Sequence, residues 1–182
     1  MTRMLDKILR QSDAIDKESL CILAGQRVWH LRLTVHCLAD AGNMLDCACP
    51  AGIVAFKHFR RSEVEVIGDV VVVSCTCTAR APVQPAIHHT PFCVTFAFFP
   101  DPTTRPVVDP SLLEQRLSAG AMSIALNAQR EICVLHKVGG VLTAPDEILQ
   151  LLNVAVGIAK ELDQLVEARL REHWAERKVE VR

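Results

Sequence analysis

The sequence predicts an α+β protein in which helices cover one face of a mostly antiparallel sheet. Segments rich in β-branched and aromatic residues, bounded by turn residues, predict the strands. They lie at residues 19–25, 27–39, 64–73, 92–99, 106–109 and 119–140, and the third and last of these each hold a strand pair. A 3-4-3 spacing of apolar residues from about residue 144 onward predicts one long helix against the sheet.

The size and composition of the chain limit what it can be. Its 182 residues fit one domain, or two small lobes around one core, and half of them are hydrophobic. The net charge of −1 gives no global attraction to nucleic acid, so any such contact must come from a local patch. No uninterrupted apolar run reaches the roughly 20 residues of a membrane span, and the charged start is unlike a signal-peptide core. We therefore expect no membrane contact.

The N-terminal half is expected to begin with a helix over residues 2–12. Two strands follow across a tight turn at Gly25–Gln26. Residues 40–43 form a second turn, because Gly42 and Asn43 both tolerate positive φ.

A helix built from small residues is expected over residues 44–59. Ala48, Gly52 and Ala55 would let its backbone lie close against a sheet. Since proline is tolerated only in the first turn of a helix, Pro50 predicts that the regular helix starts near Cys49.

The C-terminal half is expected to hold a short helix at residues 110–117, with Pro110 at its start. Thr143 and Asp146 fit a capping box for the long helix. The apolar stripe of that helix consists of Ile148, Leu151, Leu152, Ala155, Ile158, Ala159, Leu162, Leu165 and Val166. Residues 169–182 are polar, and this tail is expected to fray or to contact a partner.

The eight cysteines mostly lie in apolar runs, which is typical of reduced, buried thiols in a reducing, intracellular compartment. The pairs in "CAC" and "CTC" lack the C-x₂₋₄-C spacing of a structural zinc site. His88 and His89 have no carboxylate or cysteine beside them in the sequence, so a structural role is favoured over metal binding. We therefore expect no bound metal.

Two groups of basic residues stand out. Arg3, Lys7 and Arg10 fall at i, i+4 and i+7 on one side of the first helix, either as a solvated face or as a phosphate-contacting stripe. The cluster at Lys57, Arg60 and Arg61 lies at a helix C-terminus, where cations suit the helix dipole, so a structural explanation is favoured there.

Four segments together resemble, in order and spacing, the ribonuclease PH family. They are residues 16–61, 82–99, 107–117 and 129–140, within a resemblance that runs from residue 3 to about 165. Within the family the chain is most similar to the non-catalytic ring subunits of the eukaryotic RNA exosome. The resemblance implies a ribonuclease PH-like fold of the ribosomal protein S5 domain 2-like type, with a mixed or antiparallel sheet covered by helices. The family domain begins upstream of Met1, so residues 1–168 are expected to be its C-terminal two-thirds, followed by a polar helical tail at 169–182.

The same resemblance implies that the catalytic residues of the family are missing. Active members carry a Gly-Thr/Ser-Arg signature that holds phosphate, and here Asn43 and Met44 stand at the last two of those positions. Active members also carry two aspartates, of which one matches Asp109 while Gln115 stands at the other. An amide is neither an ionised metal ligand nor a proton acceptor, and methionine offers no donors to phosphate. Asp109 is then a relic or a plain helix N-cap.

The function implied is that of a structural and RNA-path subunit in 3′-to-5′ RNA processing and degradation, without a cofactor. The expected partners are an active-type ribonuclease PH-like subunit in a dimer, other exosome ring and cap subunits, and RNA, in the nucleus, nucleolus and cytoplasm. In the resembled subunits, the helix that matches residues 2–12 carries basic residues facing RNA, so the resemblance implies a phosphate-contacting role for Arg3, Lys7 and Arg10, with a solvated face as the equal alternative. The alternative function is a phosphate-dependent 3′-to-5′ exoribonuclease.

Overall fold

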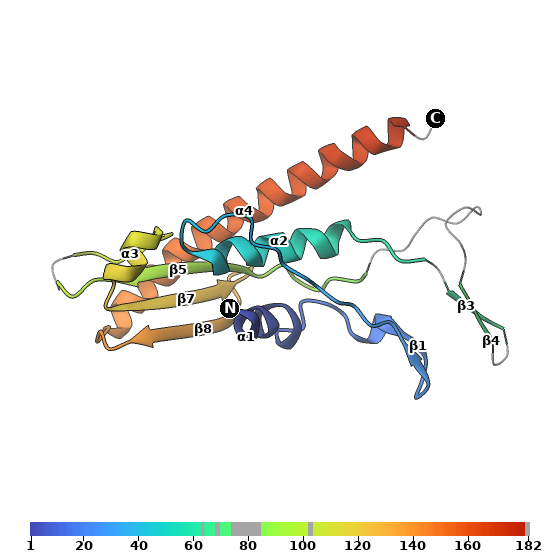
Figure 1. Ribbon diagram of the computed structural model, residues 1–182, viewed down its shortest axis with the longest axis horizontal. Coiled ribbons are helices and arrows are strands. Elements are labelled where there is room, and N and C mark those ends of the chain that lie inside the picture. The colour runs from blue at the N-terminus through green and yellow to red at the C-terminus, as the bar shows by residue number, and fades with distance from the viewer. Residues whose placement is uncertain (63, 68–69, 74–84, 102–103, 181–182) are drawn as a thin grey trace.

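The computed structural model describes residues 1–62, 64–67, 70–73, 85–101 and 104–180. The α+β class predicted from the sequence is confirmed (Figure 1). The helical elements are α1 (Thr2–Asp6), the π-helical turn η1 (Lys7–Gln11), the 3₁₀ turn η2 (Glu18–Leu20), α2 (Met44–His58), α3 (Leu112–Leu117) and α4 (Pro145–Glu180). The strands are β1 (Cys21–Leu23), β2 (Arg27–Val28), β3 (Val64–Ile67), β4 (Val70–Val73), β5 (Phe92–Phe98), β6 (Val107–Val108), β7 (Gly120–Leu126) and β8 (Ile132–Gly139).

The central sheet has the strand order β6-β5-β7-β8, and all its neighbours are antiparallel. Strand β5 pairs with β7 along its whole length, from Phe92 opposite Leu126 to Phe98 opposite Gly120. Every residue of β5 is buried. A strand buried on both faces needs no polar alternation, which explains why its sequence is a nearly continuous apolar run.

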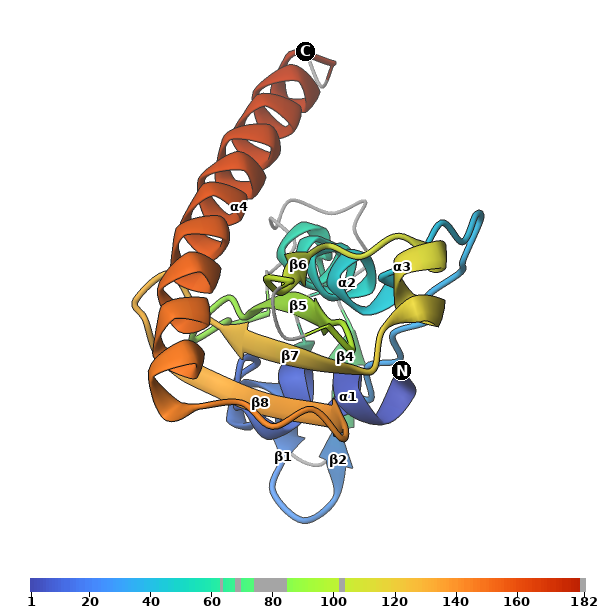
Figure 2. The same ribbon diagram turned by 90° about the vertical axis from the view of Figure 1, so that its left-hand side faces the viewer.

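Helices cover both faces of this sheet, so the prediction of one covered face is wrong. Figure 2 shows α4 on one side of the strands and α2 and α1 on the other. Phe92, Val94 and Phe96 pack with Leu151 and the small residues of α4 in one apolar cluster. A second cluster joins the opposite side of the sheet to the helical residues Ile8, Leu9, Cys49 and Ile53. Successive side chains of a strand point to opposite faces of the sheet, so the apolar residues of β5 can pack against helices on both faces.

Helix α2 begins at Met44, five residues before the predicted start. Pro50 therefore lies inside the helix, where it removes one backbone donor. Gly52 does allow close packing, but against η1 and the segment after β2 and not against a sheet as predicted, since a Cβ atom there would lie 3.0 Å from Cδ1 of Leu9 and 3.2 Å from Cδ2 of Leu33. Ala48 is buried as well, but Ala55 is exposed and takes no part in this close packing.

The predicted strand at 27–39 is shorter than expected, because its ladder with β1 ends at Val28. The chain from Trp29 to Leu33 keeps the predicted alternation, with Trp29, Leu31 and Leu33 half-buried and the residues between them exposed. No strand of the described chain runs beside it, so it forms no ladder. Together with α1, this segment lines an apolar cavity of about 770 Å³.

The hairpins were predicted well. Strands β3 and β4 pair as expected, although their turn at 68–69 lies outside the described residues, as do residues 79–84 of the proline-rich loop. Strands β7 and β8 join across a turn in which Arg130 has a φ of 73°.

The long helix differs from the prediction at both ends. Helix α4 begins at Pro145, and Oγ1 of Thr143 is buried without a hydrogen-bond partner among the described residues, so the predicted capping box does not form. The helix continues to Glu180, and fraying from residue 169 is therefore a wrong prediction over 169–180.

Candidate functional site

Two loops from distant parts of the sequence meet at the N-terminus of α2. The backbone N–H of Leu112 donates to the carbonyl of Ala41 at 2.8 Å. Gly42 has a φ of +109°, and a Cβ atom there would lie 2.4 Å from the backbone nitrogen of Leu112. Only glycine fits this approach without moving the backbone. The contact fixes Asn43 and Asp109 next to each other.

Asn43 bridges two carboxylates. It is 4% exposed and adopts a left-handed conformation, with a φ of 46°. Its Nδ2 donates to Oδ1 of Asp109 at 2.7 Å and to Oδ2 of Asp46 at 2.9 Å. An amide NH₂ group has two donors, so this bridge uses the full donor capacity of Asn43.

The second carboxylate is anchored to the central sheet. Asp46 accepts hydrogen bonds from the backbone nitrogen of Thr95 at 2.5 Å and from its Oγ1 at 2.7 Å. Oγ1 of Thr95 also lies 3.0 Å from Oγ of Ser123 on β7. The sequence reasoning missed Asp46, Thr95 and Ser123. The available signal was a hydroxyl residue within the apolar run of β5, facing an acidic residue in the first turn of a helix.

The structure corrects the helix-cap alternative for Asp109. Helix α3 is capped by Ser111, whose side chain accepts from the backbone of Glu114 while the Glu114 carboxylate accepts from the backbone of Ser111. This reciprocal pair is a capping box. The Asp109 carboxylate instead faces Asn43, and its backbone has a φ of 53°.

Met44 and Gln115 stand apart from this centre. Sδ of Met44 lies 3.8 Å from Sγ of Cys37 at the start of α2. Gln115 is exposed on α3, and its side chain makes no hydrogen bond within the described structure. No lysine or arginine of the described chain pairs with either carboxylate of the cluster. The arrangement is thus a closed amide–carboxylate network in which no described cationic group is presented to a phosphate.

The predicted basic stripe lies on the exposed side of α1 and η1. Ile8 and Leu9 are buried in the second apolar cluster, which turns Arg3, Lys7 and Arg10 toward solvent. Arg10 donates to both carboxylate oxygens of Asp6, at 2.6 and 2.9 Å. Hydrogen bonding to Arg10 lowers the pKa of Asp6, so the pair is ionised at neutral pH. Arg3 and Lys7 make no ion pair with any described residue, which leaves two of the three cations available.

The six cysteines within the described residues divide into two groups. Cys49 and Cys93 are buried, and Cys133 is partly buried and packs against the second cluster. Desolvation raises the pKa of Cys49 to about 12 and raises that of Cys93 further, so both are protonated and unreactive at neutral pH. Cys21, Cys37 and Cys47 are exposed, contrary to the prediction of mostly buried thiols. The apolar neighbours of these three in sequence do not lie around them in space.

Comparison with known proteins identifies the class of fold. Residues 89–158 match the family model described as 3′ exoribonuclease family, domain 2. A solved structure of the archaeal exosome core superimposes with a TM-score of 0.72 at 24% identity, covering 91% of this chain and 61% of the other. A structure of the Archaeoglobus fulgidus exosome with RNA bound to the active site gives a TM-score of 0.71 at 25% identity, covering 89% and 58%. The chain therefore has the ribonuclease PH fold.

Particular relatives are more similar in sequence. The chain is 41% identical to the exosome complex component rrp45 of Schizosaccharomyces pombe over 94% of its own length and 58% of the relative. It is 42% identical to the exosome complex component RRP45 of Bos taurus over 98% of its length and 40% of the relative. The resemblance to ribonuclease PH-type exosome subunits inferred from the sequence is confirmed. The chain spans about half the length of these relatives.

Among the residues that the structure describes, no helix combines the length and the hydropathy that a membrane span requires.

Proposed function

We propose that the chain acts as a subunit of an exosome core ring, contributing to 3′-to-5′ RNA processing and degradation through its partners without cleaving RNA itself. The names of its relatives support the assembly. The proposal that the chain does not cleave RNA rests on the Asn43 bridge. Both amide donors of Asn43 are used in hydrogen bonds to Asp46 and Asp109. A phosphorolytic site needs cationic donors for phosphate, and the described network has none.

The proposed contact with RNA is the stripe Arg3, Lys7 and Arg10. Arg3 and Lys7 are exposed and unpaired among the described residues, while Arg10 reaches solvent from its pair with Asp6. Such cations hold the phosphate backbone and position RNA without reading its sequence. Residues 1–168 would form the ring domain, and 169–182 a helical extension beyond it.

The proposed partners are an active-type ribonuclease PH-like subunit in a dimer, together with other ring and cap subunits. The proposed location is that of such a complex, in the nucleus, nucleolus and cytoplasm. The exposed apolar residues of the described chain, such as Val28, Leu38 and Leu142, offer surface for protein contacts.

Co-expression tests the assembly. The chain would be produced with an active-type ring partner and alone, and the mass of the soluble species would be read by light scattering. A stable heteromer, together with self-association of the chain alone, is the expected result. A well-behaved monomer or homo-oligomer that is indifferent to the partner would contradict the proposal.

A phosphorolysis assay tests the alternative function, a phosphate-dependent exoribonuclease. The purified chain is expected to shorten no 3′-labelled RNA in inorganic phosphate. Activity that survives purification to homogeneity and disappears on Asp109→Ala would establish the enzyme instead.

A further inference from the structure

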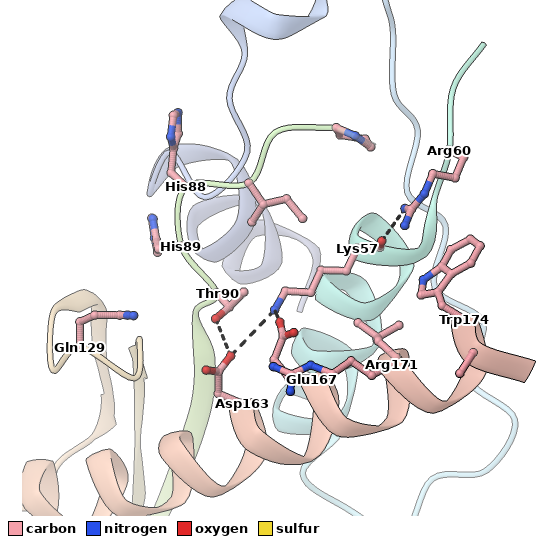
Figure 3. A pocket seen from close by; sticks show the side chains of 14 residues that line it. Lys57, Arg60, His88, His89, Thr90, Gln129, Asp163, Glu167, Arg171 and Trp174 are labelled. Carbon is pink, nitrogen blue, oxygen red and sulfur yellow. Dashed lines mark hydrogen bonds and ion pairs between the residues drawn. The ribbon is translucent and has the colours of Figure 1, made fainter. Parts of the chain in front are cut away.

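A second polar site lies on another part of the molecule, where α2 meets the distal half of α4. Its cavity of about 860 Å³ is lined by the end of α2, the loop at 85–90, the β7–β8 turn and α4 (Figure 3). Arg60 and Trp174 lie at one end of the view, and His88 and His89 at the other. The ion pairs of Lys57 lie between them.

One lysine compensates part of the negative charge on the acidic wall of this cavity. Lys57 pairs with Glu167 and lies 3.9 Å from Oδ1 of Asp163. Oγ1 of Thr90 donates to the same oxygen of Asp163 at 2.9 Å. Lys57 is nearly buried, with 11% of its side chain exposed, whereas Asp163 and Glu167 keep 26% and 42% of theirs exposed. Lys57 balances one of the two negative charges, Thr90 adds a hydrogen bond to Asp163, and neither carboxylate pairs with Arg60 or Arg171.

Arg60 is held flat without an acidic partner among the described residues. Its Nη1 donates to the carbonyls of Lys57 and Phe59, at 2.7 and 2.9 Å, at the C-terminus of α2. Its guanidinium lies over the ring of Trp174, with Cζ 4.3 Å from the ring centroid. These contacts leave other N–H donors of the fork unused. Desolvation lowers the pKa of Arg60, and a partly desolvated cation without a counter-charge is stabilised when an anion binds.

Arg171 supplies a second cation. It lines the same cavity from α4, one turn beyond Glu167, and makes no hydrogen bond or ion pair with described residues. By contrast, the nearby Arg169 is paired with Glu172 at 2.9 Å and does not line the cavity. The cavity is thus lined by two guanidinium groups that pair with no described carboxylate, and each carries the charge and the fork of donors that bind a phosphate.

We infer that this cavity binds the phosphodiester backbone of single-stranded RNA, with Arg60 and Arg171 as the phosphate-binding residues. The site lies outside the N-terminal stripe and would give the chain a second hold on the same strand. A planar guanidinium fork, here stacked on Trp174, binds carboxylates and phosphates alike, so the choice of phosphate comes from the proposed contact of the chain with RNA. The inference rests on the proposed function as an RNA-path subunit.

The test uses the full chain carrying Trp29→Phe, which leaves Trp174 as its only tryptophan. A labelled single-stranded oligouridylate is titrated at several salt concentrations, with anisotropy and Trp174 fluorescence read together. Arg171→Ala and Arg60→Lys are each expected to weaken binding about threefold to tenfold and to reduce the quenching of Trp174. The slope of log affinity against log salt should fall by about 0.7 for Arg171→Ala, which removes one charge that neutralises a phosphate, and should change less for Arg60→Lys, which keeps its charge.

Arg169→Ala is the matched control, because it removes the same charge from the same helix outside the cavity, and it should bind like the parent. The double change Arg3→Ala with Lys7→Ala separates this inference from the proposed function. It should weaken binding while Trp174 remains quenched at saturation.

Reduced affinity in the stripe variant alone, with Arg171→Ala and Arg60→Lys unchanged, would overturn the cavity assignment and leave the stripe standing. Absence of RNA binding even at low salt would overturn both RNA contacts, while the co-expression result still decides the assembly. Displacement of the RNA by an equally charged poly-glutamate peptide would overturn the assignment to phosphate.

Discussion

Asn43 links two carboxylates at the start of α2 by donating one amide proton to each. The family resemblance led to Asn43 and Asp109, but Asp46 was not predicted, because its role depends on Thr95 approaching from a strand 49 residues away. Pairings over such distances leave no local pattern in a sequence. The same limit explains the thiols, since apolar neighbours along the chain did not bury Cys21, Cys37 or Cys47.

Asn43→Asp should destabilise the fold by about 2 to 4 kcal/mol at pH 7, because it replaces both donors with a third carboxylate. The deficit should shrink toward pH 5, where a protonated carboxyl group can donate again. Urea unfolding followed by circular dichroism measures both values. Asn153→Asp, at an exposed position of α4, is the control. Equal stability of the two variants would show that the bridge contributes nothing.

The buried thiol of Cys49 should make stability depend on alkaline pH. Its pKa rises from 9.0 to about 12 on folding, so the protonated thiol is favoured in the folded state. The contribution is complete below pH 9 and is lost between pH 9 and about 12, with a slope of up to about 1.4 kcal/mol per pH unit. Urea unfolding of Cys49→Ala at pH 8, 9 and 10 should show a weaker dependence than that of Cys47→Ala, which removes an exposed thiol of the same helix.

At the scale of elements, local patterns predicted what each segment becomes better than where it ends. The hairpins and α4 follow from alternation and a 3-4-3 stripe. Pro50 was misleading, because packing of α2 against the sheet outweighs one missing backbone donor. The segment after Val28 was predicted as a strand, but no described strand pairs with it. The sequence of a segment does not say which other strand, if any, will lie beside it.

Two glycines should respond oppositely to alanine. Gly42→Ala should cost more than about 2 kcal/mol, because its φ is +109° and the new Cβ would meet backbone atoms of the α3 loop. Gly157→Ala should stabilise the chain by about 0.5 to 1 kcal/mol, since nothing lies within 4 Å of a Cβ atom there and α4 gains helix propensity. Thermal unfolding compares the two. A neutral Gly42→Ala would mean that the two loops are not held together as described.

On the scale of the whole molecule, the described chain has two well-packed clusters and an apolar cavity of about 770 Å³ beside α1. No pattern in the sequence indicates this cavity, since it arises where an alternating segment meets a helix without a neighbouring described strand. The shape of a cavity depends on how separate elements pack together in three dimensions, and amino-acid composition contains no information on that packing.

The folded chain should therefore bind the dye ANS at this cavity while its circular dichroism remains native. Leu33→Glu places a charge on the cavity wall and should lower dye fluorescence by roughly half or more. Leu113→Glu, on an exposed face of α3, should leave it unchanged. Equal fluorescence in both variants would locate the dye elsewhere.

The length of α4 sets how the molecule turns in solution. Its 36 residues extend about 54 Å, whereas a compact chain of this size has a radius of gyration of about 16 Å. Its apolar contacts with the sheet end near Val166, and Figure 1 shows the helix continuing outward to the C-terminus. Rotation about the long axis of α4 is consequently faster than end-over-end rotation. Nuclear relaxation will therefore differ between N–H bonds along this axis and those across it, even where the backbone is equally rigid.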